Sequence, residues 1–282
     1  METQLPFDAA SDSAEPCGGC LQELTLQYRM NSSILRLANS LFYEGKMKCA
    51  SEAVAQATLP ISAENVTRVL GKEGERKDSL WLKRALSPEL EDSVIFLSTE
   101  NLRDCHSPPT TSRTKVNDME IVVVDALVKK LLLLEVDAGD IGLVAPYRAQ
   151  VAALRRVLND LQNAAKLEVN TVDQYQGRDK SVIIVSFVDC INPLPPSTTS
   201  APGATPNGPV KGASSGRSDT SLLDELSRLT VALTRAKHKL IMIGCAGHPA
   251  AEAAFTDRTL CQLSRILQAQ RSVQVIPGDW AF

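Results

Sequence analysis

Apolar residues follow two alternating patterns along most of the chain. Short, nearly continuous apolar runs predict strands covered on both faces, and they occupy residues 94–97, 141–145, 169–172, 182–188 and 240–243. Between these runs, apolar positions spaced three and four residues apart predict amphipathic helices, at residues 31–42, 117–134, 148–161, 221–236 and 249–269. This alternation predicts an α/β fold with a parallel sheet.

Polar residues mark where the helix over residues 117–134 begins. Asn117 stands three residues before Glu120. This is the spacing of a capping box, in which each side chain bonds an amide that the first helical turn leaves open. The charged residues 62–92 predict a helical insertion of mixed polarity.

Changes in composition predict the domain boundaries. Residues 1–22 read as a disordered or truncated lead-in, 23–272 as one domain, and 273–282 as a tail. Residues 192–220 are rich in Pro, Gly, Ser and Thr. Such a segment cannot bury enough apolar surface to offset its ordering entropy, so we expect a disordered insertion there.

Composition and charge restrict the class of protein. The chain has 30 basic and 33 acidic residues, so any contact with nucleic acid must be local rather than a diffuse positive field. Aromatic residues make up 4%, too few for a base-stacking platform. The seven scattered cysteines and the acidic N-terminus without an apolar run favour an intracellular protein that is not secreted. The apolar residues 121–134 are interrupted by charges, which argues against a membrane span.

Four strings occur in a distinctive order: Gln27-Tyr28-Arg29-Met30, Val144 to Gln150, Thr171 to Asp179, and Thr234-Arg235-Ala236-Lys237. Their order resembles the second motor domain of superfamily-one helicases of the nonsense-decay and replication helicase/nuclease type. The resemblance covers roughly residues 24–244 without the insertion. It implies a single RecA-like, P-loop NTPase-type parallel sheet with flanking helices, present here as the second motor domain only.

The two arginines of these strings are the candidate catalytic residues. A guanidinium is permanently charged and can bind phosphate oxygens with two parallel hydrogen bonds. The resemblance implies that Arg29 and Arg235 reach the γ-phosphate across a cleft between domains, where such arginines stabilise the transferring group. The alternative is an ordinary surface arginine in an ion pair of small net value.

The resemblance also implies a set of nucleotide-binding residues. Tyr28 would lie against the adenine, with a core tyrosine as the alternative. Asp179 would face the ribose, with an acid at a helix N-terminus as the alternative. Gln176 and Gly177 belong to the same loop, and the glycine indicates either a positive φ or a close backbone approach.

A third set would contact the nucleic-acid strand. By resemblance these residues are Pro146, Tyr147 and Arg148, together with Thr171 as a backbone contact. Thr171 could equally be an ordinary strand residue. Both the loop after Ala145 and residues 174–179 follow predicted strands, which is where ligand-binding loops of parallel sheets lie. Lys237-His238-Lys239 adds local positive potential or forms a solvated end, and we interpret His238 as structural.

Other signals carry less weight. Cys17 and Cys20 have metal-ligand spacing, but no second pair completes four ligands, so we expect no metal site. Asp224-Glu225 lies in a predicted helix and reads as helix surface. Gln4-Leu5-Pro6 is only a faint match to the glutamine motif of relatives.

The sequence contains no Gly-x-x-x-x-Gly-Lys-Ser/Thr loop and no strand-borne Asp-Glu pair. Arginines alone cannot cleave a γ-phosphate without a phosphate cradle and a metal. We therefore expect this chain alone to be inactive. ATP and Mg²⁺ would be bound jointly with a first motor domain that lies outside the chain.

Strings at residues 43–47, 169–173, 177–181 and 235–240 are most similar to the eukaryotic replication helicase/nucleases. That resemblance implies the C-terminal half of an ATP-dependent 5′-to-3′ DNA helicase of replication and repair. It also implies that the partner is single-stranded DNA at a flap or resected end. The implied location is the nucleus, with the mitochondrion as a second compartment. The family's iron–sulfur cysteines belong to an upstream nuclease module. The alternatives are an RNA helicase of the nonsense-decay type and a non-catalytic fragment that binds nucleotide or nucleic acid.

Overall fold

The computed structural model describes residues 23–75, 79–102, 115–161, 163–188, 225–245 and 259–280. Several sequence-based expectations concern residues outside these ranges. They are the lead-in 1–22 with Gln4, Leu5, Pro6, Cys17 and Cys20, the insertion 192–220, and Asp224.

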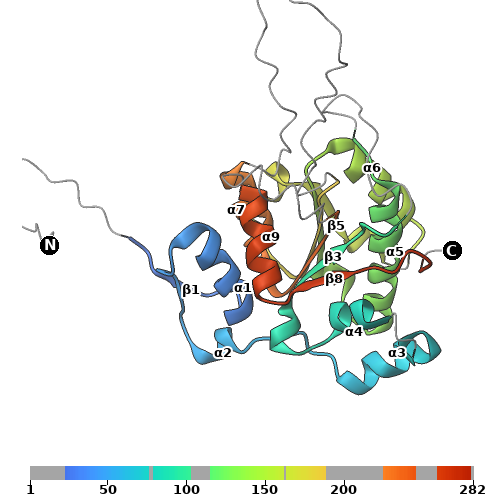
Figure 1. Cartoon of the computed structure of the whole chain (residues 1–282), viewed down its shortest axis with the longest axis horizontal. Coiled ribbons are helices and arrows are strands. Elements are labelled where there is room, and N and C mark those ends of the chain that lie inside the picture. The colour runs from blue at the N-terminus through green and yellow to red at the C-terminus, as the bar shows by residue number, and fades with distance from the viewer. Residues whose placement is uncertain are drawn as a thin grey trace, which may run out of the picture.

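A six-stranded, all-parallel sheet forms the centre of the described structure (Figure 1). Its strand order is β5-β4-β6-β7-β3-β8. The strands are β3 (Val94–Ser98), β4 (Ile141–Ala145), β5 (Glu168–Thr171), β6 (Lys180–Ser186), β7 (Ala236–Gly244) and β8 (Val273–Val275). The α/β fold with a parallel sheet that the sequence predicts is therefore confirmed.

Helices cover both faces of this sheet (Figure 1). One face packs against α3 (Ala63–Glu75), α4 (Leu80–Leu86), α5 (Asp118–Leu133) and α6 (Arg148–Leu158). The other packs against α1 (Ser32–Ala38), α7 (Leu226–Leu233) and α9 (Thr259–Ala269). Successive strand residues point to opposite faces, so Ile183 belongs to one apolar cluster and Ile184 to the other. Burial on both faces explains the nearly continuous apolar runs.

The N-terminal part adds a small element beside the main sheet. β1 (Leu26–Gln27) and β2 (Lys48–Cys49) pair in parallel, and α1 continues into a wide helical turn at Asn39–Tyr43. A short helix, α2 (Glu52–Ala55), follows. None of the helices in the described residues combines the length and apolar character needed to cross a bilayer.

The predicted start of α5 is confirmed. Asn117 caps the helix, because its side-chain oxygen accepts a hydrogen bond from the amide of Glu120 at 3.1 Å. The predicted helix end at residue 236 is wrong. Ala236 instead pairs with Lys180 as the first residue of β7, a long-range contact that local periodicity does not encode.

The sheet continues beyond residue 272, where the sequence analysis ended the domain. β8 pairs with β3, and Ile276 is fully buried with its amide bonded to the carbonyl of Ser98. Trp280 packs edge-on against Trp81 at a ring separation of 4.8 Å. Part of the expected tail thus belongs to the core.

Ile276→Ala measures how far the last residues stabilise the domain. Because the side chain is fully buried, its truncation should lower the free energy of unfolding by about 2–4 kcal/mol. The neighbouring Val275, which is 41% exposed, is the control, and Val275→Ala should cost less than about 1 kcal/mol. Urea denaturation measures both. Equally small effects would show that these residues lie outside the cooperative fold.

Lys239 of β7 is completely buried and ties the sheet to α4. Its ammonium donates to the carbonyls of Arg84 at 2.9 Å and Ser87 at 2.8 Å, at the end of that helix. Burial lowers the pKa of Lys239 from 10.5 to about 7, against an opposing effect of Asp92. The charged form is thus disfavoured in the fold although it is hydrogen-bonded.

Lys239 should therefore make stability depend on pH. Between pH 7 and 10.5 the unfolded chain binds this proton and the folded chain does not, so the free energy of unfolding should rise with pH in that window. The Lys239→Met variant should lack this rise. Lys83→Met, on the exposed side of α4, is the control and should follow the unsubstituted chain. A constant difference between Lys239→Met and the unsubstituted chain across the window would contradict the assignment.

Candidate functional site

Gln27 builds the loop that presents Tyr28 and Arg29. Its buried side chain accepts hydrogen bonds from the amides of Arg29 at 2.9 Å and Met30 at 2.7 Å, and donates to the carbonyl of Met30 at 2.8 Å. This internal bonding folds the chain tightly around the glutamine. Tyr28 therefore stands on the outside and is 76% exposed, which excludes the core tyrosine alternative.

Asn31 fastens the same loop to the main sheet. Its side chain caps α1 and also donates to the carbonyl of His238 at 3.0 Å and to Ser93 at 2.9 Å. Its amide donates to the carbonyl of Lys237 at 3.1 Å. The loop at residues 27–30 consequently lies beside the start of β7, more than two hundred residues away in sequence.

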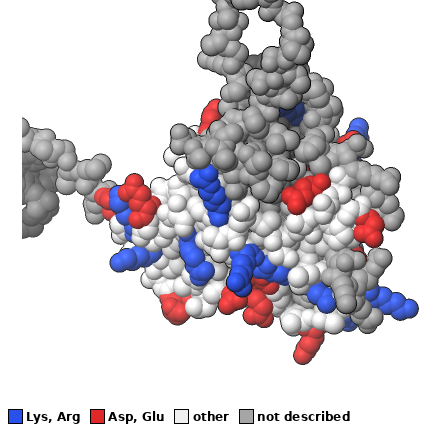
Figure 2. All heavy atoms as spheres, in the orientation of Figure 1, with Lys and Arg blue, Asp and Glu red and all other residues white. Residues whose placement is uncertain are grey.

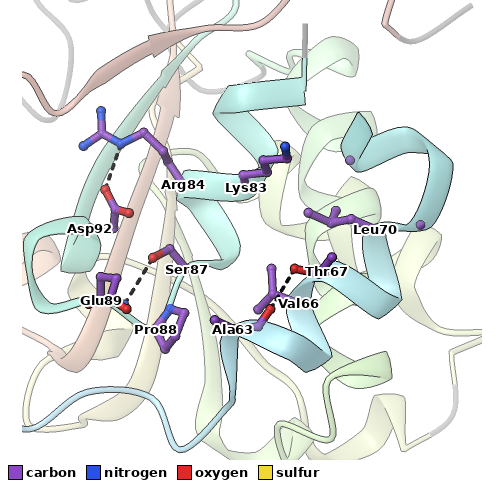
Figure 3. A pocket seen from close by; sticks show the side chains of 12 residues that line it. Ala63, Val66, Thr67, Leu70, Lys83, Arg84, Ser87, Pro88, Glu89 and Asp92 are labelled. Carbon is purple, nitrogen blue, oxygen red and sulfur yellow. Dashed lines mark hydrogen bonds and ion pairs between the residues drawn. The ribbon is translucent and has the colours of Figure 1, made fainter. Parts of the chain in front are cut away.

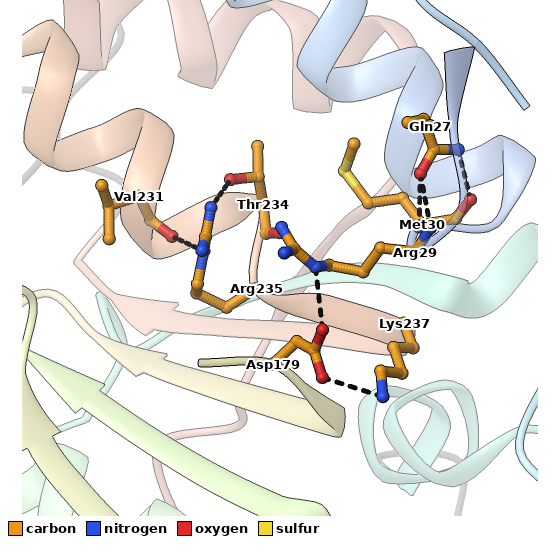
Figure 4. Close-up of polar contacts among 8 residues, drawn as sticks. All are labelled: Gln27, Arg29, Met30, Asp179, Val231, Thr234, Arg235 and Lys237. Atoms are coloured by element: carbon orange, nitrogen blue, oxygen red, sulfur yellow. Dashed lines mark hydrogen bonds and ion pairs between the residues drawn. The ribbon is translucent and has the colours of Figure 1, made fainter. Parts of the chain in front are cut away.

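The turn between α7 and β7 positions Arg235. Its Nε donates to the carbonyl of Val231 at 3.1 Å, and its Nη2 donates to the hydroxyl of Thr234 at 2.9 Å (Figure 4). The side chain therefore runs back along the last turn of α7. Burial, followed by the positive charge of Arg29, lowers the pKa of Arg235.

Asp179 joins these segments at one point (Figure 4). Its Oδ2 accepts from Nε of Arg29 at 3.1 Å, and its Oδ1 from the ammonium of Lys237 at 2.8 Å. Nη1 of Arg29 donates to the carbonyl of Thr234 at 3.1 Å. Burial would raise the pKa of Asp179, but the bonds from Lys237 and Arg29 outweigh it and lower that pKa. The sequence did not indicate this role of Lys237.

The loop before Asp179 has its own supports. Tyr175 is fully buried and packs over Gly142, where an added Cβ would collide with the tyrosine hydroxyl. On the other side, Glu168 bridges Arg178 at 3.2 Å and Lys180 at 2.9 Å. These contacts fix residues 176–179 from both ends.

Gly177 supplies conformational freedom rather than space. Its φ is +83°, and an added Cβ would meet nothing within 4 Å. Of the two reasons that the sequence left open, the positive φ is therefore the one that applies. Gln176 beside it is exposed. Asp179 precedes strand β6, not a helix, so the alternative of an acid at a helix N-terminus is wrong.

The four residues proposed to touch nucleic acid cluster elsewhere. Thr171 ends β5, and its register partner Ala145 ends β4, directly before Pro146. Tyr147 is only 2% exposed, with the ammonium of Lys115 lying 5.6 Å from its ring centre. Arg148 begins α6 and is exposed. Of this set, Arg148 thus has the most accessible side chain, and the ring of Tyr147 is not free to stack on a base.

The two groups of site residues lie at opposite edges of the sheet. Pro146 and Thr171 lie at the carboxyl ends of their strands, whereas Asp179 directly precedes β6 and Lys237 lies at the start of β7. At about 3.3 Å per residue, the five residues of β4 separate these edges by roughly 17 Å. The expectation that residues 174–179 lie at the carboxyl edge is wrong, because residues 172–179 lead the chain back to the amino edge.

A buried polar network lies under the carboxyl-edge loop, and sequence analysis did not identify it. Gln150 accepts from the amide of Asn117 at 2.9 Å and donates to the hydroxyl of Ser186 at 2.9 Å. That hydroxyl donates to Glu120, whose carboxylate also accepts the amide of Val188 at 3.0 Å. The network joins the starts of α5 and α6 to the end of β6.

The basic run at residues 237–239 is divided by the structure. Lys237 pairs with Asp179, whereas Lys239 is buried, so the interpretation as a solvated end is wrong for Lys239. His238 is half-buried, and its backbone carbonyl accepts from Asn31, which agrees with a structural role. Burial, together with the neighbouring charge of Lys237, lowers the pKa of His238.

A cavity of about 450 Å³ lies between α3 and α4, lined by Val66, Leu70 and Arg84 among others (Figure 3). None of the sequence-predicted site residues lines it.

Acidic and basic side chains both occur on the face shown in Figure 2. Within the described residues, no group of three or more His, Cys, Asp or Glu side chains could hold a metal ion.

Comparison with known proteins assigns the chain to a family. A family model described as an AAA domain matches residues 12–247. The chain is 39% identical over 226 residues to the DNA replication ATP-dependent helicase/nuclease DNA2 of Xenopus tropicalis, covering 79% of the chain and 19% of that protein. It is 36% identical over 230 residues to the human protein of the same name, covering 79% of the chain and 18% of that protein.

One further curated protein and one solved structure also match the chain. The helicase/nuclease JHS1 of Arabidopsis thaliana is 31% identical over 260 residues, which cover 90% of the chain and 16% of that protein. A solved C-terminal domain of a possible DNA helicase from Lactobacillus plantarum aligns with a TM-score of 0.32 and 13% identity, over 76% of the chain and 97% of that domain. The chain thus spans less than a fifth of the replication helicase/nucleases. The chain belongs to the AAA-domain family and is a DNA-helicase-family domain similar to a segment of the replication helicase/nucleases.

Proposed function

We propose that this chain is the second motor domain of an ATP-dependent 5′-to-3′ DNA helicase of replication and repair. The observation that carries the proposal is the cluster at the amino edge of the sheet. There, Arg29 and Lys237 both bond the carboxylate of Asp179. Arg29 also bonds the carbonyl of Thr234, which directly precedes Arg235, so three cationic side chains lie near one carboxylate. Such an excess of positive charge favours a polyvalent anion, and the triphosphate of ATP has the required charge and shape.

Arg29 and Arg235 would stabilise the charge that develops on the transferring γ-phosphoryl group. Their guanidinium groups are already held by backbone and side-chain oxygens, so little reorganisation is needed when a phosphate arrives. Asp179 would receive the ribose hydroxyls beside the loop of Gln176 and Gly177. The exposed ring of Tyr28 would cover the adenine.

The donor set fits phosphate but does not fit a magnesium ion. Mg²⁺ prefers carboxylate, water and phosphate oxygens. The one carboxylate of the cluster, Asp179, is already paired with Arg29 and Lys237, and the described residues contain no group of three or more possible metal ligands. The ion's protein ligands and the phosphate cradle would come from a first motor domain outside this chain. Mg²⁺ neutralises phosphate charge when bound, whereas this domain's residues would orient the nucleotide and complete its cationic environment.

The carboxyl edge would hold single-stranded DNA at a flap or resected end. Ala145, directly before the loop at Pro146, is the register partner of Thr171, and the exposed Arg148 follows that loop, so Arg148 lies at the same edge as the end of β5. These groups suit contacts with the sugar–phosphate backbone, which carry no sequence information. Closing of the two motor domains around ATP would then move this edge along the strand. We place this activity in the nucleus, on the basis of the replication relatives.

Arg235→Ala and Arg29→Ala test the nucleotide site in a protein that contains both motor domains. Each should lower DNA-stimulated ATP hydrolysis by about 10³-fold or more, because each removes charge that stabilises the transition state. Arg228→Ala is the matched control, since Arg228 forms exposed ion pairs with Asp173 and Glu225. It should keep turnover within about twofold. Unchanged turnover in Arg235→Ala would remove that residue from the catalytic site.

Arg148→Ala tests the nucleic-acid edge. Loss of one phosphate contact should weaken binding to a dT oligonucleotide and reduce the salt slope of log K by about 0.7, with little change in sequence preference. Arg156→Ala, exposed on the same helix, is the control and should bind as the parent protein does. Fluorescence anisotropy at several salt concentrations measures both. Equal salt slopes for the parent and Arg148→Ala would contradict the contact.

A further inference from the structure

Arg29 has one nitrogen without a partner at the cluster. Nε donates to Asp179 and Nη1 to the carbonyl of Thr234. Among the described residues, nothing accepts a hydrogen bond from Nη2. Nη2 and Nε lie on the same side of a guanidinium, and this is the edge that a carboxylate normally binds with both oxygens.

Asp179 uses only one of its oxygens on Arg29. The second, Oδ1, is held at 2.8 Å by the ammonium of Lys237, which comes from the neighbouring strand β7 (Figure 4). Without the ammonium of Lys237, the carboxylate of Asp179 could turn and accept hydrogen bonds from Nε and Nη2 of Arg29 together. Such a bidentate pair would occupy the edge of Arg29 that a phosphate needs.

We propose that Lys237 is a positioning residue that keeps the Arg29–Asp179 pair monodentate and so leaves Nη2 of Arg29 available to phosphate. The inference rests on the proposed nucleotide site and extends it to a residue with an indirect role. In it, Lys237 acts through Asp179 and does not itself bind the nucleotide. The same ammonium also holds Asp179 in place, because it donates to the oxygen that Arg29 does not use.

A double-mutant cycle on the 282-residue chain distinguishes this role from direct phosphate binding. The probe is inorganic tripolyphosphate, titrated by calorimetry at low ionic strength. If Lys237 acts through Asp179, Lys237→Met should weaken binding at least about fivefold more in the parent chain than in the Asp179→Asn background. Lys237→Arg keeps a cation and a donor to Oδ1, and should stay within about twofold of the parent.

A direct phosphate ligand would give the opposite sign. Replacing Asp179 by asparagine would release Lys237 toward the phosphate, so the loss caused by Lys237→Met would be larger in the Asp179→Asn background. An equal loss in both backgrounds would also overturn the proposal. Either result would leave the nucleotide site itself intact, provided that Arg29→Lys and Arg235→Lys still weaken binding.

NMR of the arginine side chains tests the geometry without any phosphate. In Lys237→Met, bidentate capture should slow rotation about the Cζ–Nη2 bond of Arg29, with the signal assigned by its loss in Arg29→Lys. The same signal in Lys237→Arg should match the parent. Unchanged Arg29 rotation in Lys237→Met would overturn the proposal. If the parent chain does not bind tripolyphosphate without the first motor domain, the NMR result decides the role of Lys237, and ATP hydrolysis by the protein with both motor domains tests the proposed function.

Discussion

The arrangement at the amino edge depends on the carboxylate of Asp179. One oxygen bonds Arg29, from a loop near the start of the chain, and the other bonds Lys237, from the beginning of β7. Gln27 and Asn31 hold the first segment in place, and Tyr175 holds the loop of Asp179. Three stretches of sequence far apart in the chain thus meet because a single anion lies among cations that would otherwise repel one another.

The parallel sheet separates the two groups of candidate site residues. Its amino edge collects charge around Asp179, whereas its carboxyl edge carries the loop before Arg148 and the end of β5 at Thr171. The sheet between them is buried on both faces and is therefore rigid. The proposed function would need such rigidity, because it requires the two edges to move together.

Local patterns in the sequence predicted those features whose causes are local. All five residues of β4 are buried, so its apolar run marked the strand, and the cap of α5 depends only on Asn117 and Glu120. Features set by distant contacts escaped prediction. Tyr28 and Tyr147 each precede an arginine, yet one is exposed and the other buried, because Gln27 turns the first outward. The edge at which Asp179 lies depends on how residues 172–179 cross the sheet.

In the proposed function, Arg29 and Arg235 line one side of a nucleotide site. The most direct test is a structure of the protein containing both motor domains with ADP and aluminium fluoride, which imitates the transferring phosphoryl group. We expect both guanidinium groups within hydrogen-bond distance of the fluoride ligands, at about 2.7–3.2 Å. Guanidinium groups that lie beyond hydrogen-bond distance of the fluoride ligands, with the nucleotide bound elsewhere, would contradict the proposed site.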